Sequence, residues 1–456
     1  MKVQFEFSPR RPETVNEVFL VGSFNSWNKG VTPMKPDEKR RLWRHSLEVP
    51  EGFYPYKFLV NGVDWHYDWK AKRFEQNELG SLNSLAMVTE KKVVHATFSP
   101  LGPTCSDEIT IYSEKPASLL WSVNGWHPCP RGYLKNTVPN LEVNVQQMEE
   151  DRASGRYKTT IGPFNMRKVP EVIVYTFVYP DGTVDDNYGK NYWIPIDLAL
   201  EGECRIDSFK SKALAADRPF RVYMPPRGRG DQKFPLLILL HGYGGSHLAD
   251  WLQVETVKML AERYGIILIW VDGNVWVWGE TIPSWYINSP KAANALMEDY
   301  IIKELIPYAE AAYPVSGQRA IGGISMGGFG SLYLATRYPG TFRAAASFSA
   351  IYNLYRYRRI DALRKLVGDE NSWKKNQFNV IKLVSGAKDT DFFFLVGDEE
   401  RGALRDNFNL KLAMDKAGIR NEFRIYPGNH TNNFWRIHLQ EMMEFFARQL
   451  GCVRTE

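Results

Sequence analysis

Two patterns of hydrophobic and polar positions divide this chain at about residue 203. Before that point, short segments rich in β-branched and aromatic residues, such as 17–22, 54–60 and 172–178, are separated by turns that contain Gly, Pro, Asn or Asp. Such segments are typical of strands in all-β domains. Their number suits two immunoglobulin-like sandwiches, so we expect one domain over residues 1–92 and a second over residues 93–203.

From residue 204 to residue 456, apolar runs alternate with segments of helical periodicity. The runs 236–240, 266–271 and 392–396 contain no polar residue, and helical spacing is clearest over 300–310. Strands that are apolar on both faces and separated by helices are typical of a mostly parallel sheet. The chain is therefore expected to be a multidomain protein, in which an α/β-hydrolase domain follows two all-β sandwiches.

A serine motif lies inside the predicted α/β domain. Gly323-Ile-Ser325-Met-Gly327 stands between a predicted strand at 318–324 and a predicted helix at 328–338. In the G-x-S-x-G turn the glycines permit a close approach of strand and helix, and the serine is raised above the sheet as a nucleophile. Strand, turn and helix occur in the required order, so the sequence predicts that Ser325 is a nucleophile raised on this turn.

A glycine-rich loop follows the predicted strand 236–240. Its sequence is His241-Gly-Tyr243-Gly-Gly, and an acyl-transfer enzyme places an oxyanion donor in such a loop. We expect the backbone N–H groups of Tyr243 and Met326 to face the oxygen that becomes negatively charged. His241 precedes the serine, whereas the base of this fold follows the acid, so we expect His241 to order the loop.

The base and the acid should follow later strands. His430 comes after the predicted strand 422–426 and is the preferred base, and His438 lies in a predicted helix, where a surface role is the alternative. Glu400, three residues past Gly397, is the preferred acid. Asp398 is the runner-up, and a solvated acidic loop is the third reading of this segment.

Residues from about 209 to 450 resemble the esterase D group of α/β-hydrolases, which includes tributyrin, feruloyl and enterobactin esterases. The resemblance rests on the serine motif, the glycine-rich loop, the 300–307 helix and Pro427-Gly-Asn-His430. It implies hydrolysis of an ester through an acyl-serine, without a metal or cofactor. It also implies that Trp285 and Tyr286 border the substrate pocket, although a core role fits them equally. Glu400 replaces the aspartate that is usual in the group.

Residues 17–88 resemble the family 48 glycogen-binding module of AMP-activated protein kinase and branching enzymes. The resemblance runs through Val18–Trp27, Pro50–Trp65 and Glu78–Asn83. It implies that two indoles stack on glucose rings while polar side chains bond the hydroxyl groups. The alternative is a module that only packs on its neighbour. The positions that the resemblance assigns to the glucan are Trp27, Lys57, Trp65, Leu79, Ser81 and Asn83.

Residues 94–200 resemble, more faintly, a starch-binding module of family 25. Trp121 and Trp126 are its candidate stacking platforms. Val184 stands where that family usually has an aromatic residue, so a structural spacer is the alternative. The aromatic content of 14%, with 14 Trp, is consistent with sugar platforms and equally with β-sandwich cores.

Composition narrows the remaining possibilities. The net charge of +5 comes from 57 basic and 52 acidic residues that are interspersed, so nucleic acid is not an expected partner. Apolar runs of about six residues are far shorter than the roughly 20 that cross a bilayer, so we expect no membrane span. The four cysteines show no metal-ligand spacing, and they are either reduced or joined as Cys105–Cys129.

These observations predict a serine carboxylesterase that acts on short-acyl or carbohydrate-linked esters and carries modules that bind α-glucan. No cofactor is expected. The N-terminal segment reads as a strand, which favours a cytoplasmic protein, or a secreted one if the chain is already processed. Two other functions fit the same sequence: an acyltransferase on this scaffold, and a glucan-binding scaffold with an inactive hydrolase domain.

Overall fold

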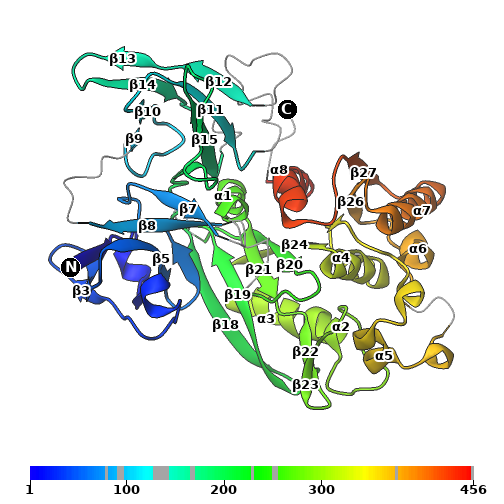
Figure 1. Cartoon of the computed structure of the whole chain (residues 1–456). Coiled ribbons are helices and arrows are strands. Elements are labelled where there is room, and N and C mark those ends of the chain that lie inside the picture. The colour runs from blue at the N-terminus through cyan, green and yellow to red at the C-terminus, as the bar shows by residue number, and fades with distance from the viewer. Residues whose placement is uncertain are drawn as a thin grey trace. The chain divides into compact units, whose positions relative to one another are not determined.

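A computed structural model describes residues 1–77, 81–89, 97–126, 143–164, 170–226, 231–248, 255–374 and 378–452, without the side chain at position 433. The chain forms two compact units, Met1–Ala199 and Leu200–Glu456. Strands dominate the first unit, and strands alternate with helices in the second (Figure 1). The predicted boundary at residues 92 and 93 lies outside the described residues and stays a prediction.

Residues 1–89 form two antiparallel sheets around one aromatic core. A three-stranded sheet has the order β1-β4-β3, and a second sheet has the order β2-β5-β8-β7, with β6 paired to β5. Phe5, Leu20, Tyr56 and Phe58 are buried between them, because alternate residues of each strand point inward. The strands are β1 (Lys2–Phe7), β2 (Val18–Gly22), β3 (Lys35–Asp37), β4 (Leu42–Glu48), β5 (Gly52–Val60), β6 (Asp64–His66), β7 (Phe74–Gln76) and β8 (Leu82–Val88), with short 3₁₀ helices at Pro12–Thr14 and Ser23–Asn25.

The rest of the first unit has two further antiparallel sheets. One has the order β13-β14-β10-β9, and the other has the order β12-β11-β15-β16, with β17 paired to β15. The strands are β9 (Phe98–Ser99), β10 (Ile109–Ser113), β11 (Ser118–Val123), β12 (Asn144–Gln147), β13 (Glu149–Asp151), β14 (Arg156–Ile161), β15 (Val172–Val178), β16 (Val184–Asp185) and β17 (Tyr192–Pro195). Cys129 lies outside the described residues, so the Cys105–Cys129 pairing stays a prediction.

The second unit is built on an eight-stranded sheet with the order β18-β19-β21-β20-β24-β25-β26-β27. Pairing is antiparallel from β18 to β21 and parallel from β21 to β27. Its strands are β18 (Glu203–Ser211), β19 (Ala216–Met224), β20 (Phe234–Leu240), β21 (Ile267–Val271), β24 (Val315–Ile324), β25 (Ala344–Phe348), β26 (Asp391–Gly397) and β27 (Asn421–Tyr426). All residues of β25 and β26 are buried, as expected for strands covered on both faces.

Helices cover both faces of this sheet. A Cβ atom on Gly322 would lie 3.0 Å from the Phe446 ring, and one on Gly328 would lie 2.5 Å from Ser347 Oγ, so α8 and α4 pack tightly on β24 and β25. The helices are α1 (Glu255–Tyr264), α2 (Met297–Asp299), α3 (Ile306–Ala312), α4 (Met326–Arg337), α5 (Asp361–Val367), α6 (Val380–Leu383), α7 (Arg401–Ala417) and α8 (Asn432–Gln449), with 3₁₀ turns at Leu354–Tyr357, Glu370–Ser372 and Val384–Gly386. β22 (Asn274–Val277) and β23 (Glu280–Pro283) form a separate hairpin.

The predicted helix over 300–310 is not a regular α-helix. Its first part, Tyr300–Leu305, is a π-helical segment, and the Ile306 N–H bonds to the Ile301 carbonyl. Pro307 comes directly after Ile306 and has no N–H to donate, so it cannot continue a regular α-helical hydrogen-bond ladder from this turn.

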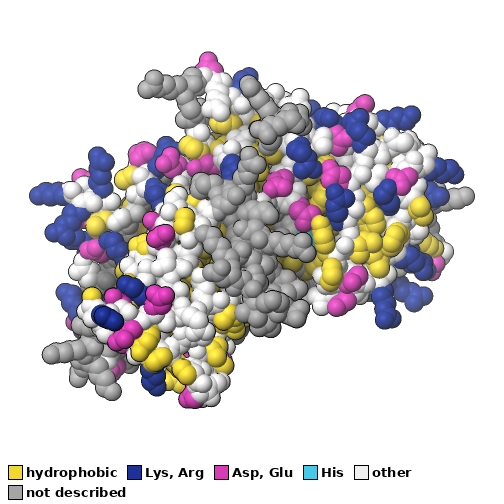
Figure 2. Space-filling model, turned by 90° about the horizontal axis from the view of Figure 1, so that it is seen from above, with side chains coloured by type: hydrophobic (Ala, Val, Ile, Leu, Met, Phe, Trp, Pro, Cys, Tyr) yellow, Lys and Arg dark blue, Asp and Glu magenta, His cyan; other side chains and the backbone are white. Residues whose placement is uncertain are grey.

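Among the described residues, no helix combines the length and the apolar character needed to span a bilayer. On the face drawn in Figure 2, basic and acidic side chains are interspersed.

Candidate active site

Ser325 occupies a strained turn between β24 and α4. Its φ is +49°, in the left-handed region that a residue with a side chain rarely adopts, and its N–H donates to the Phe348 carbonyl at 2.8 Å. A Cβ atom on Gly323 would lie 2.4 Å from the Gly327 carbonyl oxygen, and one on Gly327 would lie 2.1 Å from the Leu240 carbonyl oxygen. Both glycines of the motif are therefore required by close backbone approaches, as the sequence predicted.

His430 reaches Ser325 from the loop between β27 and α8. Its Nε2 atom lies 3.0 Å from Ser325 Oγ, and the edge of the ring faces the indole of Trp435, with 4.8 Å between ring centroids. Thr431 caps α8, since its side chain accepts from the Phe434 N–H. The His430 side chain is 47% exposed, so one face of the imidazole is open to solvent.

Glu400 holds the other side of the imidazole. Its Oε2 atom lies 2.6 Å from His430 Nδ1, and its Oε1 atom accepts from Ser349 Oγ at 2.6 Å and from the Gly397 N–H at 3.0 Å. Trp435 Nε1 donates to Ser349 Oγ at 2.8 Å. The carboxylate is nearly buried, at 5% exposure. With Nδ1–H bound to the carboxylate, Nε2 is left as the acceptor that faces the serine.

The alternative residues from the sequence make other contacts. Asp398 accepts from the Gly428 N–H at 3.0 Å, and Glu399 accepts from Asn429 Nδ2 at 3.3 Å, so both brace the loop that carries His430. His438 lies in α8, where its ring stacks on Tyr426 with centroids 4.0 Å apart. The sequence did not identify Ser349 and Trp435, because neither is close in sequence to the glutamate that they position.

The loop after β20 lies beside Ser325. A Cβ atom on Gly242 would be 3.7 Å from Ser325 Cβ, and the Gly245 N–H bonds to the Gly242 carbonyl across a turn that contains Tyr243. Met326 is the first residue of α4, where helical N–H groups lack intrahelical acceptors. Within the part of the chain that the structure describes, the N–H groups of Tyr243 and Met326 have no protein acceptor. Both can therefore bond a substrate oxygen.

Buried polar groups fix this loop. His241 Nε2 accepts from the Gly273 N–H at 2.8 Å, which leaves Nδ1 to donate to the Gly242 carbonyl at 2.7 Å. Asn274 Nδ2 donates to the Gly245 carbonyl at 2.9 Å. These bonds agree with the prediction that His241 orders the loop.

Asp272 is the acidic centre of this network. Its Oδ1 atom accepts from the Asn274 N–H at 3.0 Å, and Arg218 lies 3.9 Å from its Oδ2 atom. Burial raises the pKa of the Asp272 carboxyl, but the neighbouring His241 and His247 side chains and the Arg218 charge outweigh burial and hold the pKa well below its usual range. The carboxylate thus stabilises the folded unit at neutral pH.

We expect Asp272→Asn to destabilise the second unit by about 1–3 kcal/mol at pH 7, because a buried acceptor with several donors is lost. A carboxyl whose pKa is depressed in the folded state contributes stability above its unfolded pKa of about 3.9 and loses it as pH falls through the folded value. The difference in unfolding temperature from the parent should therefore be constant from about pH 8 to 5 and shrink below about pH 4. Thermal unfolding across pH measures this, with exposed Asp217→Asn as the control. A difference independent of pH down to about 2 would contradict it.

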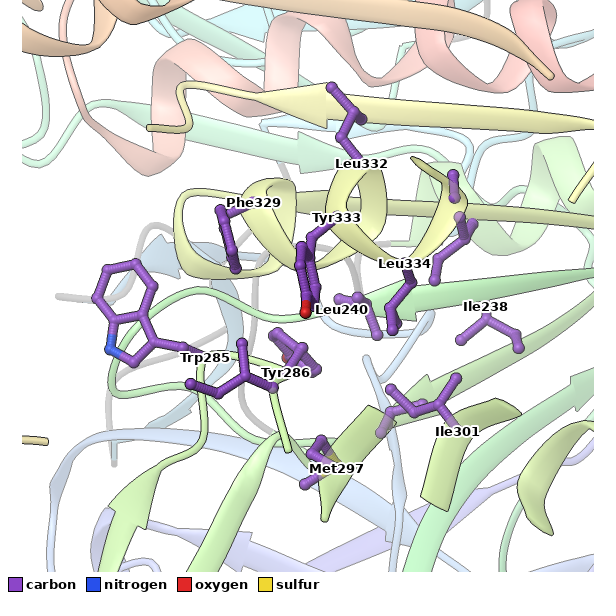
Figure 3. Packing of buried hydrophobic residues seen from close by; sticks show 14 of the residues in the cluster. Ile238, Leu240, Trp285, Tyr286, Met297, Ile301, Phe329, Leu332, Tyr333 and Leu334 are labelled. Atoms are coloured by element: carbon purple, nitrogen blue, oxygen red, sulfur yellow. The ribbon is translucent and has the colours of Figure 1, made fainter. Parts of the chain in front are cut away.

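Tyr286 and Trp285 lie beneath the glycine-rich loop. The Tyr286 ring is fully buried, and a Cβ atom on Gly273 or on Gly330 would come within 2.5 Å of it. Its hydroxyl donates to the His241 carbonyl at 3.1 Å, so burial favours the core role for this residue. Trp285 packs between Tyr243 and Phe329, with 6.3 Å between ring centroids in each pair, and so adjoins the loop and α4 (Figure 3).

Three of the residues predicted to bind glucan, Lys57, Trp65 and Asn83, lie on one face of the sheet that contains β5. Leu59 pairs with Trp65, which puts Trp65 and Lys57 on the face opposite the aromatic core. Lys57 Nζ donates to Ser81 Oγ at 3.1 Å, and the Lys29 ammonium lies over the Trp65 ring at 5.5 Å. Asn83 neighbours Ser84, which pairs with the core residue Tyr56, so Asn83 is on this face too, although buried. Trp27 is 36% exposed, and Leu79 lies outside the described residues.

The two platform candidates of the second β module differ. Trp126 is 37% exposed, whereas Trp121 is 2% exposed, and its Nε1 atom donates to Gln146 Oε1 at 3.1 Å. Stacking on a sugar requires an exposed ring face, so Trp121 is a core residue and the sequence assignment is corrected. Strand alternation identifies the two faces of β11 but not which face is covered.

Comparison with known proteins follows the division into two units. The model of the putative esterase family matches residues 211–446, and that of the glycogen recognition site of AMP-activated protein kinase matches residues 10–94. The chain is 28% identical to an S-formylglutathione hydrolase of Mus musculus over 54% of this chain and 94% of the relative. It is 22% identical to an acetyl esterase of Caldicellulosiruptor saccharolyticus over 52% and 91%. A solved S-formylglutathione hydrolase from Agrobacterium tumefaciens covers 55% of this chain and 97% of its own, with 21% identity and a TM-score of 0.49.

Proposed function

The chain belongs to the putative esterase family, as a carboxylesterase with an N-terminal glycogen-binding module, and we propose that Ser325, His430 and Glu400 carry out its chemistry. The observation that carries the proposal is the continuous contact from Ser325 Oγ to His430 Nε2 at 3.0 Å and from His430 Nδ1 to Glu400 Oε2 at 2.6 Å. A hydroxyl, an imidazole and a buried carboxylate in this order activate serine as a nucleophile.

In the first half of the reaction, Ser325 Oγ attacks the ester carbonyl carbon while His430 Nε2 takes the hydroxyl proton. The carbonyl oxygen becomes negatively charged and accepts from the N–H groups of Tyr243 and Met326. Glu400 stabilises the imidazolium and keeps its orientation. The intermediate then expels the alcohol, which takes the proton from His430, and the acyl group remains on the serine oxygen.

In the second half, water replaces the alcohol. The water oxygen attacks the acyl carbon while His430 Nε2 takes a proton from the water. His430 then donates that proton to Ser325 Oγ when the carboxylic acid leaves. The imidazole is half exposed, which gives water access to the acyl-serine. This mechanism uses side chains and backbone groups of the chain alone.

We propose short-acyl or carbohydrate-linked esters as substrates. The similarity to an acetyl esterase supports a short acyl group, and the glycogen-binding module supports an ester carried by, or held near, a polysaccharide. The three-domain arrangement of 1–92, 93–203 and 204–456, with two immunoglobulin-like sandwiches ahead of the hydrolase domain, is part of this proposal. Trp126 is the remaining exposed platform candidate of the second module.

A hydrolysis panel tests the proposed reaction. The panel runs from acetyl through longer acyl esters to feruloyl esters and acetylated polysaccharides, and mass spectrometry of the quenched enzyme locates the acyl group. We expect turnover of the acetyl esters and an acyl group on Ser325. Absence of hydrolysis across the panel, or an acyl group on another residue, would overturn the proposal.

We expect Trp27→Ala with Trp65→Ala to weaken glycogen binding by about tenfold or more, because truncation of an anchoring Trp commonly costs more than about 1 kcal/mol of binding energy. Native affinity electrophoresis in gels that contain glycogen measures the change. Phe408→Ala removes an exposed aromatic ring of the second unit and serves as the control. Equal retardation of the parent and the double variant would refute the assignment of this face as the glucan site.

A further inference from the structure

The hairpin β22–β23 presents two tryptophans to solvent. Val275 and Val277 are buried, at 1% and 2% exposure, and the alternation of the strand therefore turns Trp276 outward. Trp276 is 61% exposed, and Trp278, at the tip of the hairpin, is 58% exposed. Single exposed apolar residues are common, but Trp276 and Trp278 stand two residues apart on one hairpin, and clustered exposed apolar side chains commonly mark interaction sites.

Trp278 stands at a position of the hairpin turn that disfavours a bulky residue. Val277 pairs with Glu280, so Trp278 and Gly279 form a two-residue turn with φ values of +49° and +82°. A turn with two positive φ values favours Asn-Gly, because a bulky residue is strained at the first position. Trp278 thus combines backbone strain with an exposed apolar ring. Residues that are unfavourable for stability in this way tend to occur at functional sites.

Polar groups near the hairpin are balanced in charge. Asn294 Nδ2 donates to the Trp276 carbonyl at 3.0 Å, which places an amide beside the backbone of β22. Lys365 pairs with Glu280 at 2.6 Å and with Asp361 at 2.7 Å, and Arg364 pairs with Asp361 at 2.9 Å, so two cations compensate two carboxylates. A surface of indole rings, amide and paired charges complements a neutral ligand with many hydroxyl groups. A polyanion would instead be matched by a cluster of uncompensated cations.

The base of the hairpin is joined to the loop beside Ser325. Gly273, directly before β22, donates its N–H to His241 and accepts from Ser284 Oγ at 2.6 Å, which closes the base. Asn274, the first residue of β22, donates to Gly245 of the glycine-rich loop. The four-residue strand β22 spans about 13 Å at 3.3 Å per residue. The two tryptophans therefore lie within about one strand length of a residue that contacts the glycine-rich loop.

We propose that the hairpin with Trp276 and Trp278 is a carbohydrate-binding platform of the catalytic unit, which holds the sugar chain of an esterified, uncharged oligosaccharide or polysaccharide. The flat indole faces stack on the apolar C–H faces of sugar rings, and Asn294 bonds a hydroxyl group. The inference rests on the proposed ester hydrolysis. It adds a second sugar contact to that of the N-terminal module and assigns the alcohol part of the substrate.

The test compares two kinds of ester in the full-length chain. For the parent and for Trp276→Thr with Trp278→Asn, kcat/KM is measured on p-nitrophenyl acetate, on acetylated malto-oligosaccharides and on acetylated xylo-oligosaccharides. Threonine suits an exposed strand, and asparagine suits the turn, so the hairpin is expected to stay folded. We expect the ratio of sugar-ester to p-nitrophenyl acetate kcat/KM to fall by about tenfold for at least one sugar series.

Two further variants make the result specific. Trp276→Phe with Trp278→Phe keeps aromatic faces and should retain most of the ratio, and Leu412→Gln, at an exposed site on α7, should leave it unchanged. A parent that hydrolyses p-nitrophenyl acetate while the Thr/Asn variant keeps the full ratio for both sugars would overturn the platform and leave the esterase proposal standing. A parent inactive on every ester would instead overturn the proposed function.

Discussion

Ser325→Ala is expected to lower kcat for p-nitrophenyl acetate by at least about 10⁴-fold, because alanine has no oxygen to form the acyl-serine. The residual rate comes from substrate binding and from the N–H groups of Tyr243 and Met326, which the substitution leaves in place. The Cβ atom is retained, so the contacts of the turn should survive. Thermal unfolding should therefore resemble that of the parent.

The control is Ser316→Ala, which removes an exposed hydroxyl from the other end of the same strand, β24. It should keep parent activity. If Ser325→Ala retained more than about a tenth of the parent kcat, a loss too small for a nucleophile, Ser325 would not be the nucleophile. A folded, inactive Ser325→Ala variant that still binds glycogen would also separate the two functions of the chain.

Glu400→Gln should lower kcat by about 10³–10⁴-fold, through the tautomer of His430. Oε1 of Glu400 accepts from Ser349 and from the Gly397 N–H, so the amide oxygen of a glutamine takes that position. The amide nitrogen then faces His430 Nδ1 and donates to it. The imidazole proton moves to Nε2, which can no longer accept from Ser325.

Asp398→Asn is the matched comparison for this prediction. An asparagine oxygen can still accept from the Gly428 N–H, so kcat should fall by less than about tenfold. Both variants are measured on p-nitrophenyl acetate across pH, with thermal unfolding as a check on structure. Equal losses of kcat in the two variants, or a larger loss in Asp398→Asn, would show that Glu400 is not the acid.

The elements that position the site were accessible from local pattern. The apolar runs at 236–240 and 392–396 lie in β20 and β26. Gly323 and Gly327 flank the serine because a Cβ atom at either position would lie less than 3 Å from a backbone carbonyl oxygen. The constraint on Gly323 acts within the motif, and the constraint on Gly327 comes from the end of β20, the strand paired with β24. The requirement for glycine at both positions is visible in the sequence as a short motif.

Assignments that depend on contacts between residues far apart in the sequence could not be made from the sequence. Glu400 and Asp398 are two residues apart, and what distinguishes their contacts is Ser349, 51 residues away from Glu400. Trp121 and Trp276 both lie within a strand, yet one is 2% and the other 61% exposed. Exposure is set by which elements cover a strand. The sequence therefore flags aromatic residues without sorting core from surface.

The loops after β26 and β27 remain joined beyond the ends of their strands by contacts of successive side chains. Asp398 bonds Gly428, Glu399 bonds Asn429, and Glu400 bonds His430, each pair separated by 30 positions. The three contacts therefore keep the two loops in a fixed register. Inserting one residue into either loop would slide the acid out of step with the imidazole, and a matching insertion in the other would be needed to restore it. The lengths of these two loops are consequently coupled, and a change in one requires a matching change in the other.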